Sequence, residues 1–314
     1  MLNGIAPSPR VLQQIQQARG HADAFLANLE IPLTRETAKA TRKSAEELKR
    51  HDQWILKADP GHAEFIKRAG IDLVTLANNH AMDYGPNGLH EMISNLDRVG
   101  ILHAGAADNA AEAMRPTYLK LKNGKTIALL SVLAFMTPKA LRKTTPATLT
   151  EPGIAVLGFG GNLGTAAKAK LSRWILAAHQ GADYVIVGTH WGVERKPLPN
   201  AYQVGLGRAL VDAGADVVWG NHPHVLEGAE IYNGHTILYS CGNLVSSLPA
   251  ETGLFRVTIT EDGIQKVGFL PARDQGHQVT LLKGPPAVFA KHGQQLLNQL
   301  LLKRFPSTVS VPAF

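Results

Sequence analysis

Two apolar runs that each deliver histidine indicate how this chain folds: ADYVIVGTHWGVERK (residues 182–196) and ADVVWGNHPHVLEGAEIYNGHTILYSCGNLVS (residues 215–246). Both runs are rich in β-branched residues and end in a glycine-containing turn. His190 follows the first run, and His222 and His224 follow the second. Ligand sites in open α/β sheets gather at the carboxyl ends of strands. Three imidazoles in such places favour metal ligands over ordinary surface residues.

The composition is that of a folded globular protein. Hydrophobic residues make up 45% and charged residues 18% of the 314 positions, unlike a disordered chain. Lys and Arg number 32 against 25 Asp and Glu, a net charge of +7, which permits an anionic partner. The basic residues are spread along the chain, so an ordinary solvated surface remains the alternative to a docking patch. The single cysteine excludes an internal disulfide and a cysteine-rich zinc site.

No targeting or membrane-spanning segment is evident in the sequence. No apolar run approaches the roughly 18 residues of a membrane span. The first residues, MLNGIAPSPR, lack the charged, apolar and cleavage regions of a signal peptide.

Helix-like and strand-like segments alternate over the first two-thirds of the chain. Helices are predicted over residues 7–19, 60–70, 86–99, 165–180 and 201–213, and strands over residues 22–29, 71–76, 101–103, 183–189 and 216–219. Turn pairs such as Asn123-Gly124 and Asn233-Gly234 mark hairpins, which dominate residues 225–270. A polar stretch over residues 34–52 predicts an exposed helix or lid, and a last helix is predicted over residues 287–304. The pattern predicts α/β layers around mixed sheets, with an antiparallel C-terminal third.

His222-Pro223-His224 is the most specific of the histidine motifs. In an extended chain, residues i and i+2 point to the same face, and Pro223 biases His222 toward extended geometry. A chance pair is not rare in a chain with 13 histidines, but this pair follows a strand and a Gly-Asn turn. We therefore interpret both residues as metal ligands.

The nearby pair strengthens the interpretation of His190 as a metal ligand. Alone, a histidine at a strand end is more often a hydrogen-bonded core residue. Glu194, four residues further on, either orients a metal ligand from behind, as carboxylates near metal-bound imidazoles do, or lies on the surface.

Two further strand ends carry polar residues. Asn78-Asn79-His80 follows the strand over residues 71–76, and Asp83 is close enough in a turn to hold the other nitrogen of the His80 imidazole. A carboxamide oxygen beside an imidazole suits a metal ligand next to a catalytic acid. The alternative is a polar turn that caps the next helix. Glu30 ends its own strand and could supply an anionic, bridging oxygen.

Together the strand ends predict a metal site. Its residues come from four places in the chain: Glu30, Asn79 with His80, His190, and His222 with His224. A nitrogen and oxygen set without sulfur suits Zn, Mn, Fe or Mg. Two metals about 3.5–4 Å apart can activate a water and stabilise the oxygens of a phosphoryl displacement.

Five blocks carry a family resemblance: NLEIPL (28–33), LANNHAMDYGPNGL (76–89), THWGVE (189–194), GNHPHV (220–225) and YSCGNLV (239–245). In order and spacing they resemble the bacterial CapA/PgsA capsule-biosynthesis family, which is linked to poly-γ-glutamate and related to calcineurin-like metallophosphatases. The resemblance covers about residues 3–270. It implies a four-layer α/β sandwich with two divalent metals, formed by residues 1–271, and a C-terminal extension with one helix over residues 272–314.

The resemblance also implies a role for each site residue. The resemblance implies Glu30 as the bridging or shared carboxylate and Asn79 as a metal ligand. It implies that His190 and His222 bind one metal and that His224 binds the other. The implied catalytic pair is His80, as general acid or anion stabiliser, with Asp83 behind it.

The chain departs from the family pattern at its N-terminus. The family's first strand ends in Gly-Asp, whose Asp is a metal ligand, and a Met-Leu-Gly-like segment usually follows. Here Met1-Leu2-Asn3-Gly4 stands where that segment should follow the Asp. We therefore expect the first strand and its ligand to be missing, along with any upstream signal or membrane anchor. The resemblance places the protein in the cell envelope, in contact with membrane-associated capsule machinery through that segment.

Two functions fit these observations. The first is a metal-dependent hydrolase of phosphoesterase type, in which His80 assists the leaving oxygen of an anionic substrate. The alternative is a non-hydrolytic accessory of capsule polymer synthesis or export that binds a polyanion through its basic surface. Nucleic acid is not an expected partner, because the basic residues lack the interleaved aromatics of a single-strand platform.

Overall fold

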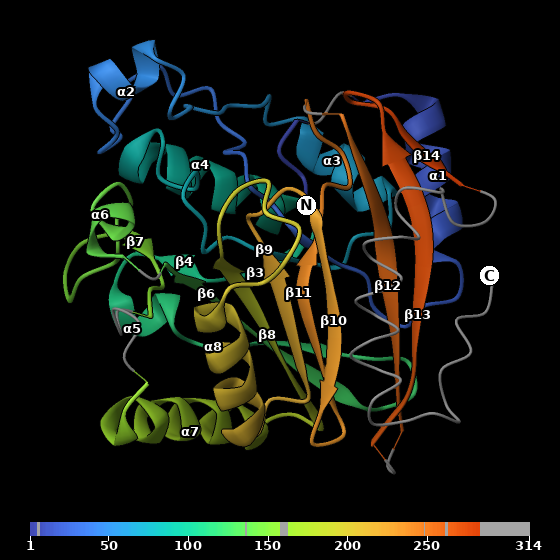
Figure 1. Ribbon diagram of the computed structural model, residues 1–314. Helices are drawn as coiled ribbons and strands as arrows, with labels where there is room; N and C mark the ends of the chain where they lie inside the picture. The colour runs from blue at the N-terminus through green and yellow to red at the C-terminus, as the bar shows by residue number, and fades with distance from the viewer. Residues whose placement is uncertain (5–6, 136, 158–162, 248, 261–262, 283–314) are drawn as a thin grey trace.

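A computed structural model describes residues 1–4, 7–135, 137–157, 163–247, 249–260 and 263–282 (Figure 1). The helix predicted over residues 287–304 lies outside these ranges. Within them, helices are interspersed with strands as far as β9, and the antiparallel pairs β10–β11 and β12–β13 follow. The prediction of an α/β protein with mixed sheets and an antiparallel C-terminal third is confirmed.

A small parallel sheet is built from β1 (Leu26–Asn28), β2 (Leu73–Thr75) and β3 (Leu102–Ala104), in the order β1-β2-β3. Three amphipathic helices share a core with it: α1 (Pro9–Arg19), α3 (His62–Arg68) and α4 (Gly85–Arg98). The strand predicted over residues 22–29 is shorter than expected. The Phe25 N–H is bound by the Asp72 carboxylate instead of a strand partner.

The central sheet has six strands in the order β10-β11-β9-β8-β6-β5. Its parallel strands are β6 (Thr126–Ala134), β8 (Tyr184–Trp191), β9 (Val217–Asn221) and β11 (His235–Cys241). β5 (Thr117–Lys120) and β10 (Leu226–Tyr232) are antiparallel edge strands, and β5 forms the predicted hairpin with β6.

The two sheets face each other, and helices cover their outer sides. Leu73 of β2 packs against Leu129, Ile186 and Val217 of the six-stranded sheet. On the opposite face of that sheet, α7 (Thr165–His179) and α8 (Ala201–Asp212) bury their apolar sides (Figure 1). Burial on both faces explains why the parallel strands read as continuous apolar runs.

A third sheet closes the described chain. β12 (Ala250–Thr260), β13 (Gly263–Asp274) and β14 (Val279–Leu281) form an antiparallel sheet, seen at the right of Figure 1. β13 runs through residue 271, where the sequence suggested a division. The division into a domain and an extension stays a prediction.

The connecting segments hold only short elements. The excursion over residues 34–52 contains α2 (Ala45–Lys49), which begins at a capping box of Ser44 and Glu47. The remaining pieces are α5 (Ala110–Ala113), α6 (Pro138–Leu141), β4 (Ala106–Ala107) and β7 (Gly153–Ile154). In the described part of the chain, no helix has the length and apolar character needed to cross a membrane.

Candidate metal centre

The carboxyl ends of four parallel strands meet at one edge of the paired sheets. β1 and β2 run in register, as do β8 and β9, where His190 lies opposite Asn221. The residues that follow these strands therefore come together although they are far apart in the sequence. Glu30 follows β1, and Asn79 and His80 follow β2.

Three of the predicted ligands form a tight buried group. Glu30, His190 and His222 can each place one donor atom within 4.8 Å of the others. Glu30 Oε1 lies 3.2 Å from His190 Nε2. All three side chains are buried, so the group is shielded from bulk water.

Asn79 and His224 flank this group. Asn79 Oδ1 lies 2.8 Å from His190 Nε2, so its carboxamide oxygen faces the group. His224 Nε2 lies 4.0 Å from Glu30 Oε1. The other nitrogen, His224 Nδ1, lies 3.0 Å from Asn243 Oδ1 and 3.3 Å from Asn3 Nδ2. That contact pattern directs the Nε2 of His224 toward Glu30.

Unsatisfied buried atoms in the group fit a metal ion. Among the described residues, neither carboxylate oxygen of Glu30 accepts a well-aligned hydrogen bond, and Nδ1 of His190 and of His222 has no partner. A buried carboxylate without donors is costly. A divalent cation would satisfy it, and nitrogen and oxygen donors without sulfur suit Zn, Mn or Fe.

The electrostatics of the group favour the ligating protonation states. Burial alone would raise the pKa of Glu30, but the His190 and His224 imidazoles outweigh it and hold that pKa below its usual value. Burial lowers the pKa of His190 and brings that of His222 well below its usual value. A charged carboxylate beside neutral imidazoles is the combination that binds a cation.

His222 and His224 reach the site by a backbone path that the sequence did not predict. His222 has a φ of 99° and His224 a φ of 59°, both in the left-handed region. The prediction that Pro223 holds His222 in an extended chain is therefore wrong, because the chain turns sharply after β9. The two rings still converge, with centroids 6.2 Å apart. Such backbone costs of order 1–3 kcal/mol per residue and clusters at functional sites. Here the Arg195 N–H donates to the Pro223 carbonyl at 2.8 Å and supports the turn.

His80 and Asp83 lie together as predicted, with Asp83 Oδ2 2.8 Å from His80 Nδ1. A third residue, Lys43, completes a buried triad. Its Nζ donates to Asp83 Oδ1 at 2.5 Å and lies 3.1 Å from His80 Nδ1. The same Nζ donates to the Trp54 carbonyl at 2.7 Å. Burial lowers the pKa of Lys43, and the Asp83 carboxylate opposes that effect.

Lys43 is the site residue that sequence reasoning missed. It follows Arg42 in a polar stretch that was predicted to be exposed, and no pattern there separates the buried lysine from its exposed neighbours. Asp83 also accepts the Leu56 N–H at 2.9 Å. Residues 43 and 56, at and just beyond this polar excursion, thus both fasten the chain to Asp83.

A cleft of about 370 Å³ opens beside the metal group. Asn79 and His222 form part of its wall, and Lys139 and Lys143 contribute positive charge. Glu194 is exposed and also borders the cleft. It does not hold His190 or His222 from behind, because Nδ1 of each has no described partner. The surface alternative for Glu194 is the one that the structure supports.

These features define an α/β protein with a buried carboxylate–histidine group at the shared edge of two facing sheets. Residues 6–248 match the family described as "Bacterial capsule synthesis protein PGA_cap". The chain belongs to this family, and the resemblance drawn from the five sequence blocks is confirmed.

Several proteins of known description are similar to this chain. The PGA biosynthesis protein CapA of Bacillus subtilis is 32% identical over 238 residues, which cover 75% of this chain and 56% of that protein. The capsule biosynthesis protein CapA of Bacillus anthracis is 31% identical over 235 residues, which cover 75% of this chain and 53% of that protein. A probable polyglutamine synthesis accessory protein of Mycobacterium tuberculosis is 26% identical over 248 residues, which cover 76% of this chain and 62% of that protein. The chain thus spans about half the length of the two CapA proteins.

Proposed function

We propose that this chain is a divalent-metal-dependent hydrolase of phosphoesterase type that serves capsule or poly-γ-glutamate biosynthesis. The observation that carries the proposal is the buried group of Glu30, His190 and His222, whose donor atoms lie within 4.8 Å of one another. The arrangement of two facing sheets with helices outside supports a metallophosphatase-like fold. Family membership supports the biological setting.

Glu30, His190 and His222 would hold one ion, with Asn79 beside His190. The flanking His224, together with Glu30, would hold a second. A bound divalent cation supplies Lewis-acid polarisation of an anionic substrate.

His80 is the proton-carrying residue of the proposed site. Its Nδ1 faces Asp83 Oδ2, which leaves Nε2 to give a proton to a leaving oxygen or to stabilise an anion. His80 is also close enough to the metal group to influence the pKa of Glu30 and of His190. Lys43 holds Asp83 and therefore acts as a positioning residue.

Two lysines beside the cleft support an anionic substrate. Lys139 and Lys143 line the cleft with His222. Lys143 also pairs with Glu47, however, and Asp52 and Glu194 bring negative charge to the same lining. Phe135 packs over the inner end, with its ring centroid 4.8 Å from that of His222. A phosphoester in the cleft would lie near these lysines and beside the buried group at His222.

The test combines metal analysis with a phosphatase assay. Elemental analysis and 4-nitrophenyl phosphate hydrolysis would be measured for the wild type, His222→Ala and the matched control His90→Ala. His90 is an exposed histidine that pairs with Asp108. We expect metal and activity in the wild type and the control, and loss of both in His222→Ala. A folded wild-type protein that binds no metal and has no activity would contradict the proposal.

One alternative function has its own support. The net charge of +7 suits a polyanion-binding accessory, and one relative is described as a probable accessory protein. Binding of poly-γ-glutamate by a wild type that holds metal and hydrolyses no phosphoester would favour this alternative.

A further inference from the structure

Residues 44–53, most of which belong to the polar excursion, have no share in the apolar core. None of them is buried, and none belongs to a described hydrophobic cluster. Their helix, α2, lies at the outer edge of the molecule, away from both facing sheets (Figure 1). A segment with few buried apolar contacts belongs to the least stable part of a fold. The position of residues 44–53 therefore depends on polar contacts.

One ion pair joins this segment to the body of the protein. Glu47 Oε1 lies 2.5 Å from the Nζ of Lys143, which follows α6. The other polar contacts that residues 44–53 make with described residues stay inside the segment, such as those of Arg50 with Glu46 and Asp52. The Glu47 and Lys143 side chains are 19% and 24% exposed, so water screens this pair less than the pairs of Arg50.

The pair holds Glu47 in its charged form. The hydrogen bond from Lys143 is the largest of the effects that lower the pKa of Glu47 to about 2. Ser44 adds to this effect through its N–H and its hydroxyl group, both of which donate to Glu47 Oε2. A charged carboxylate thus occupies the Lys143 ammonium group at neutral pH.

Lys143 also belongs to the cleft beside the metal group. It lines this cleft together with His222, and Asp52 and Gln53 line it from the end of the segment. The ion pair therefore links two parts of the cleft wall, one formed by residues 52–53 and the other by residues 137–144. A lysine carries its charge on a flexible four-carbon stem. An anion in the cleft would compete with Glu47 for that charge.

We propose that residues 44–53 form a lid on the cleft and that the Glu47–Lys143 ion pair is its latch, which an oxyanion ligand releases by taking Lys143 from Glu47. The lid lies between two fixed points, since Lys43 Nζ and the Leu56 N–H both donate to Asp83. Glu47 is then a specificity-determining residue, because a ligand gains the Lys143 contact only by displacing an internal carboxylate. The entry of an anionic ligand rests on the proposed function, whereas the latch itself does not.

Glu47→Gln tests the latch and preserves the start of α2. Glutamine serves in a capping box as glutamate does, so Ser44 keeps its partner while the charge that holds Lys143 is lost. Lys143→Met removes the other partner. Glu46→Gln is the first matched control, because Glu46 pairs within the segment. Lys139→Met is the second, because Lys139 lines the same cleft but is not the lysine that holds Glu47.

Limited trypsin digestion of the full chain measures opening of the lid. Lys49 and Arg50 are exposed cleavage sites within it, and proteolysis follows the population of the locally open form. Mass spectrometry would give the rate of cleavage after these two residues, in EDTA, so that the readout needs neither bound metal nor hydrolysis. Each protein would be digested in NaCl and in inorganic tripolyphosphate at equal ionic strength. A short peptide substrate corrects for effects on trypsin, and circular dichroism confirms that each variant is folded.

We expect Glu47→Gln and Lys143→Met to speed cleavage in NaCl at least about fivefold, and the double variant to be no faster than the faster single variant, because both changes break one contact. The two controls should match the wild type. Tripolyphosphate should speed cleavage of the wild type at least about threefold and leave Glu47→Gln and Lys143→Met unchanged, because a ligand shifts an equilibrium only through contacts that differ between its two states.

Equal cleavage of the wild type and Glu47→Gln would overturn the latch. A wild type that tripolyphosphate does not affect, or a Lys143→Met variant that it affects equally, would overturn release by an anion at Lys143. A wild type that holds no metal and hydrolyses no phosphoester, yet gives the expected cleavage rates, would support the lid and contradict only the proposed function.

Discussion

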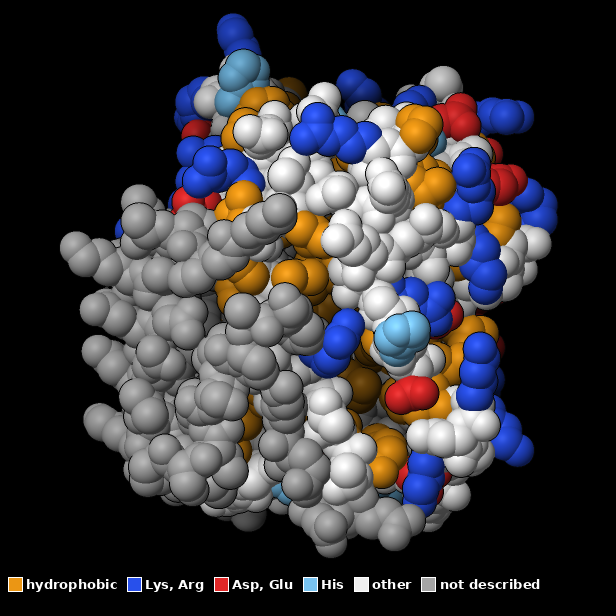
Figure 2. All heavy atoms as spheres, turned by 90° about the vertical axis from the view of Figure 1, so that its right-hand side faces the viewer, with side chains coloured by type: hydrophobic (Ala, Val, Ile, Leu, Met, Phe, Trp, Pro, Cys, Tyr) orange, Lys and Arg blue, Asp and Glu red, His pale blue; other side chains and the backbone are white. Residues whose placement is uncertain are grey.

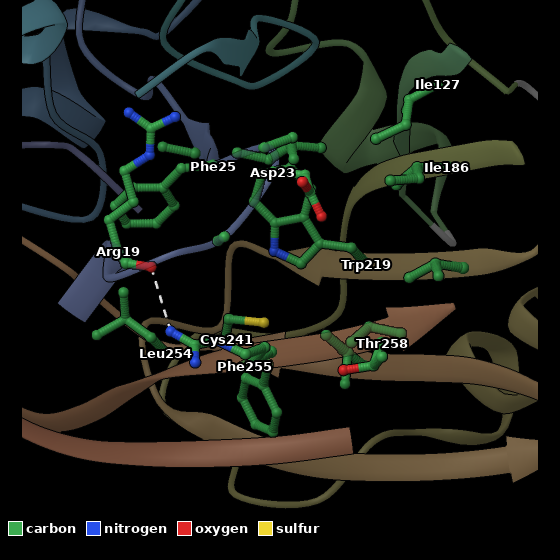
Figure 3. A pocket seen from close by; sticks show the side chains of 18 of the residues that line it. Arg19, Asp23, Phe25, Ile127, Ile186, Trp219, Cys241, Leu254, Phe255 and Thr258 are labelled. Carbon is green, nitrogen blue, oxygen red and sulfur yellow. Dashed lines mark hydrogen bonds between the residues drawn. The ribbon is translucent and has the colours of Figure 1, made fainter. Parts of the chain in front are cut away.

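Two regions border β1: the buried group of Glu30, His190 and His222 at its carboxyl end (the metal edge), and an apolar cavity of about 400 Å³ lined by residues 21–27 and 253–259 (Figure 3). They are built from different kinds of groups. Figure 2 shows hydrophobic side chains gathered in a hollow on the face that carries the third sheet. At the carboxyl end of β1, the polar groups belong to the side chains of Glu30, His190 and His222. Along its free edge, the polar groups are those of the backbone, and the side chains are apolar. The first region is therefore marked by residue identity, whereas the second is marked by a strand edge on which, among the described residues, Leu2 pairs at one end only.

A second contrast separates two buried carboxylates at the metal edge. Asp83 contacts Lys43 Nζ and His80 Nδ1 and accepts the Leu56 N–H, so its charge is compensated within the protein. Glu30 is equally buried but accepts no well-aligned hydrogen bond from the described residues. The difference fits the proposed roles of Asp83 as a positioning acid and Glu30 as a metal-binding acid. The predictions below test both contrasts.

The largest effect is expected at Lys43. Lys43→Met removes the cation and leaves Asp83 charged and buried, which should lower the free energy of unfolding by about 3–5 kcal/mol. The double variant Lys43→Met/Asp83→Asn removes both charges and should recover most of that loss. Urea denaturation measures all of these values, with Lys49→Met on the exposed face of α2 as the control. A single variant as stable as the control would show that the triad does not fasten the excursion.

A third buried carboxylate, Glu227, behaves differently from both, because burial raises its pKa to about 8. Its unfolded pKa is near 4.5, so the folded state binds the extra proton between these values. The stability that Glu227 contributes is present below about pH 4.5 and is lost as the pH rises through about 8. Glu227→Gln should therefore gain roughly 3–4 kcal/mol of stability relative to the wild type between pH 5 and pH 8. Gln203 Nε2, which lies 2.6 Å from Glu227 Oε2, has an acceptor in both proteins. Urea denaturation at the two pH values measures the gain, and a pH-independent difference would contradict it.

A smaller effect is expected when the stability cost of a substitution beside the cavity is compared with that of one in a filled core. Val217 borders the cavity, whereas Val187 on the neighbouring strand packs beneath α7 and α8. Val187→Ala should cost about 2 kcal/mol, and Val217→Ala about 1 kcal/mol, because the removed methyl groups of Val217 already face empty space. Thermal unfolding of the pair measures the difference. Equal costs would indicate that the cavity is filled in solution.

The sequence predicted which strand-end residues lie together better than it predicted the rest of the molecule. Glu30, His190 and Asn79 could be found because each follows an apolar strand, and parallel strands bring their carboxyl ends together. The left-handed backbone at His222 could not be predicted, because it depends on the turn after β9. The burial of Lys43 could not be predicted either, because the surrounding fold decides which lysine of a polar segment is buried. The cavity carries no residue signature at all, since the edges of β1 and β12 meet only in the folded chain.

The most direct test of the account is Mn²⁺ binding by the wild type and by Glu30→Gln, measured by isothermal titration calorimetry. The substitution preserves volume and removes the charge that faces His190. Glu46→Gln, on the exposed face of α2, is the matched control. The account predicts that the wild type and the control bind Mn²⁺ alike and that Glu30→Gln binds it at least about 100-fold more weakly. Equal affinity in all three proteins, or no binding by a folded wild type, would contradict it.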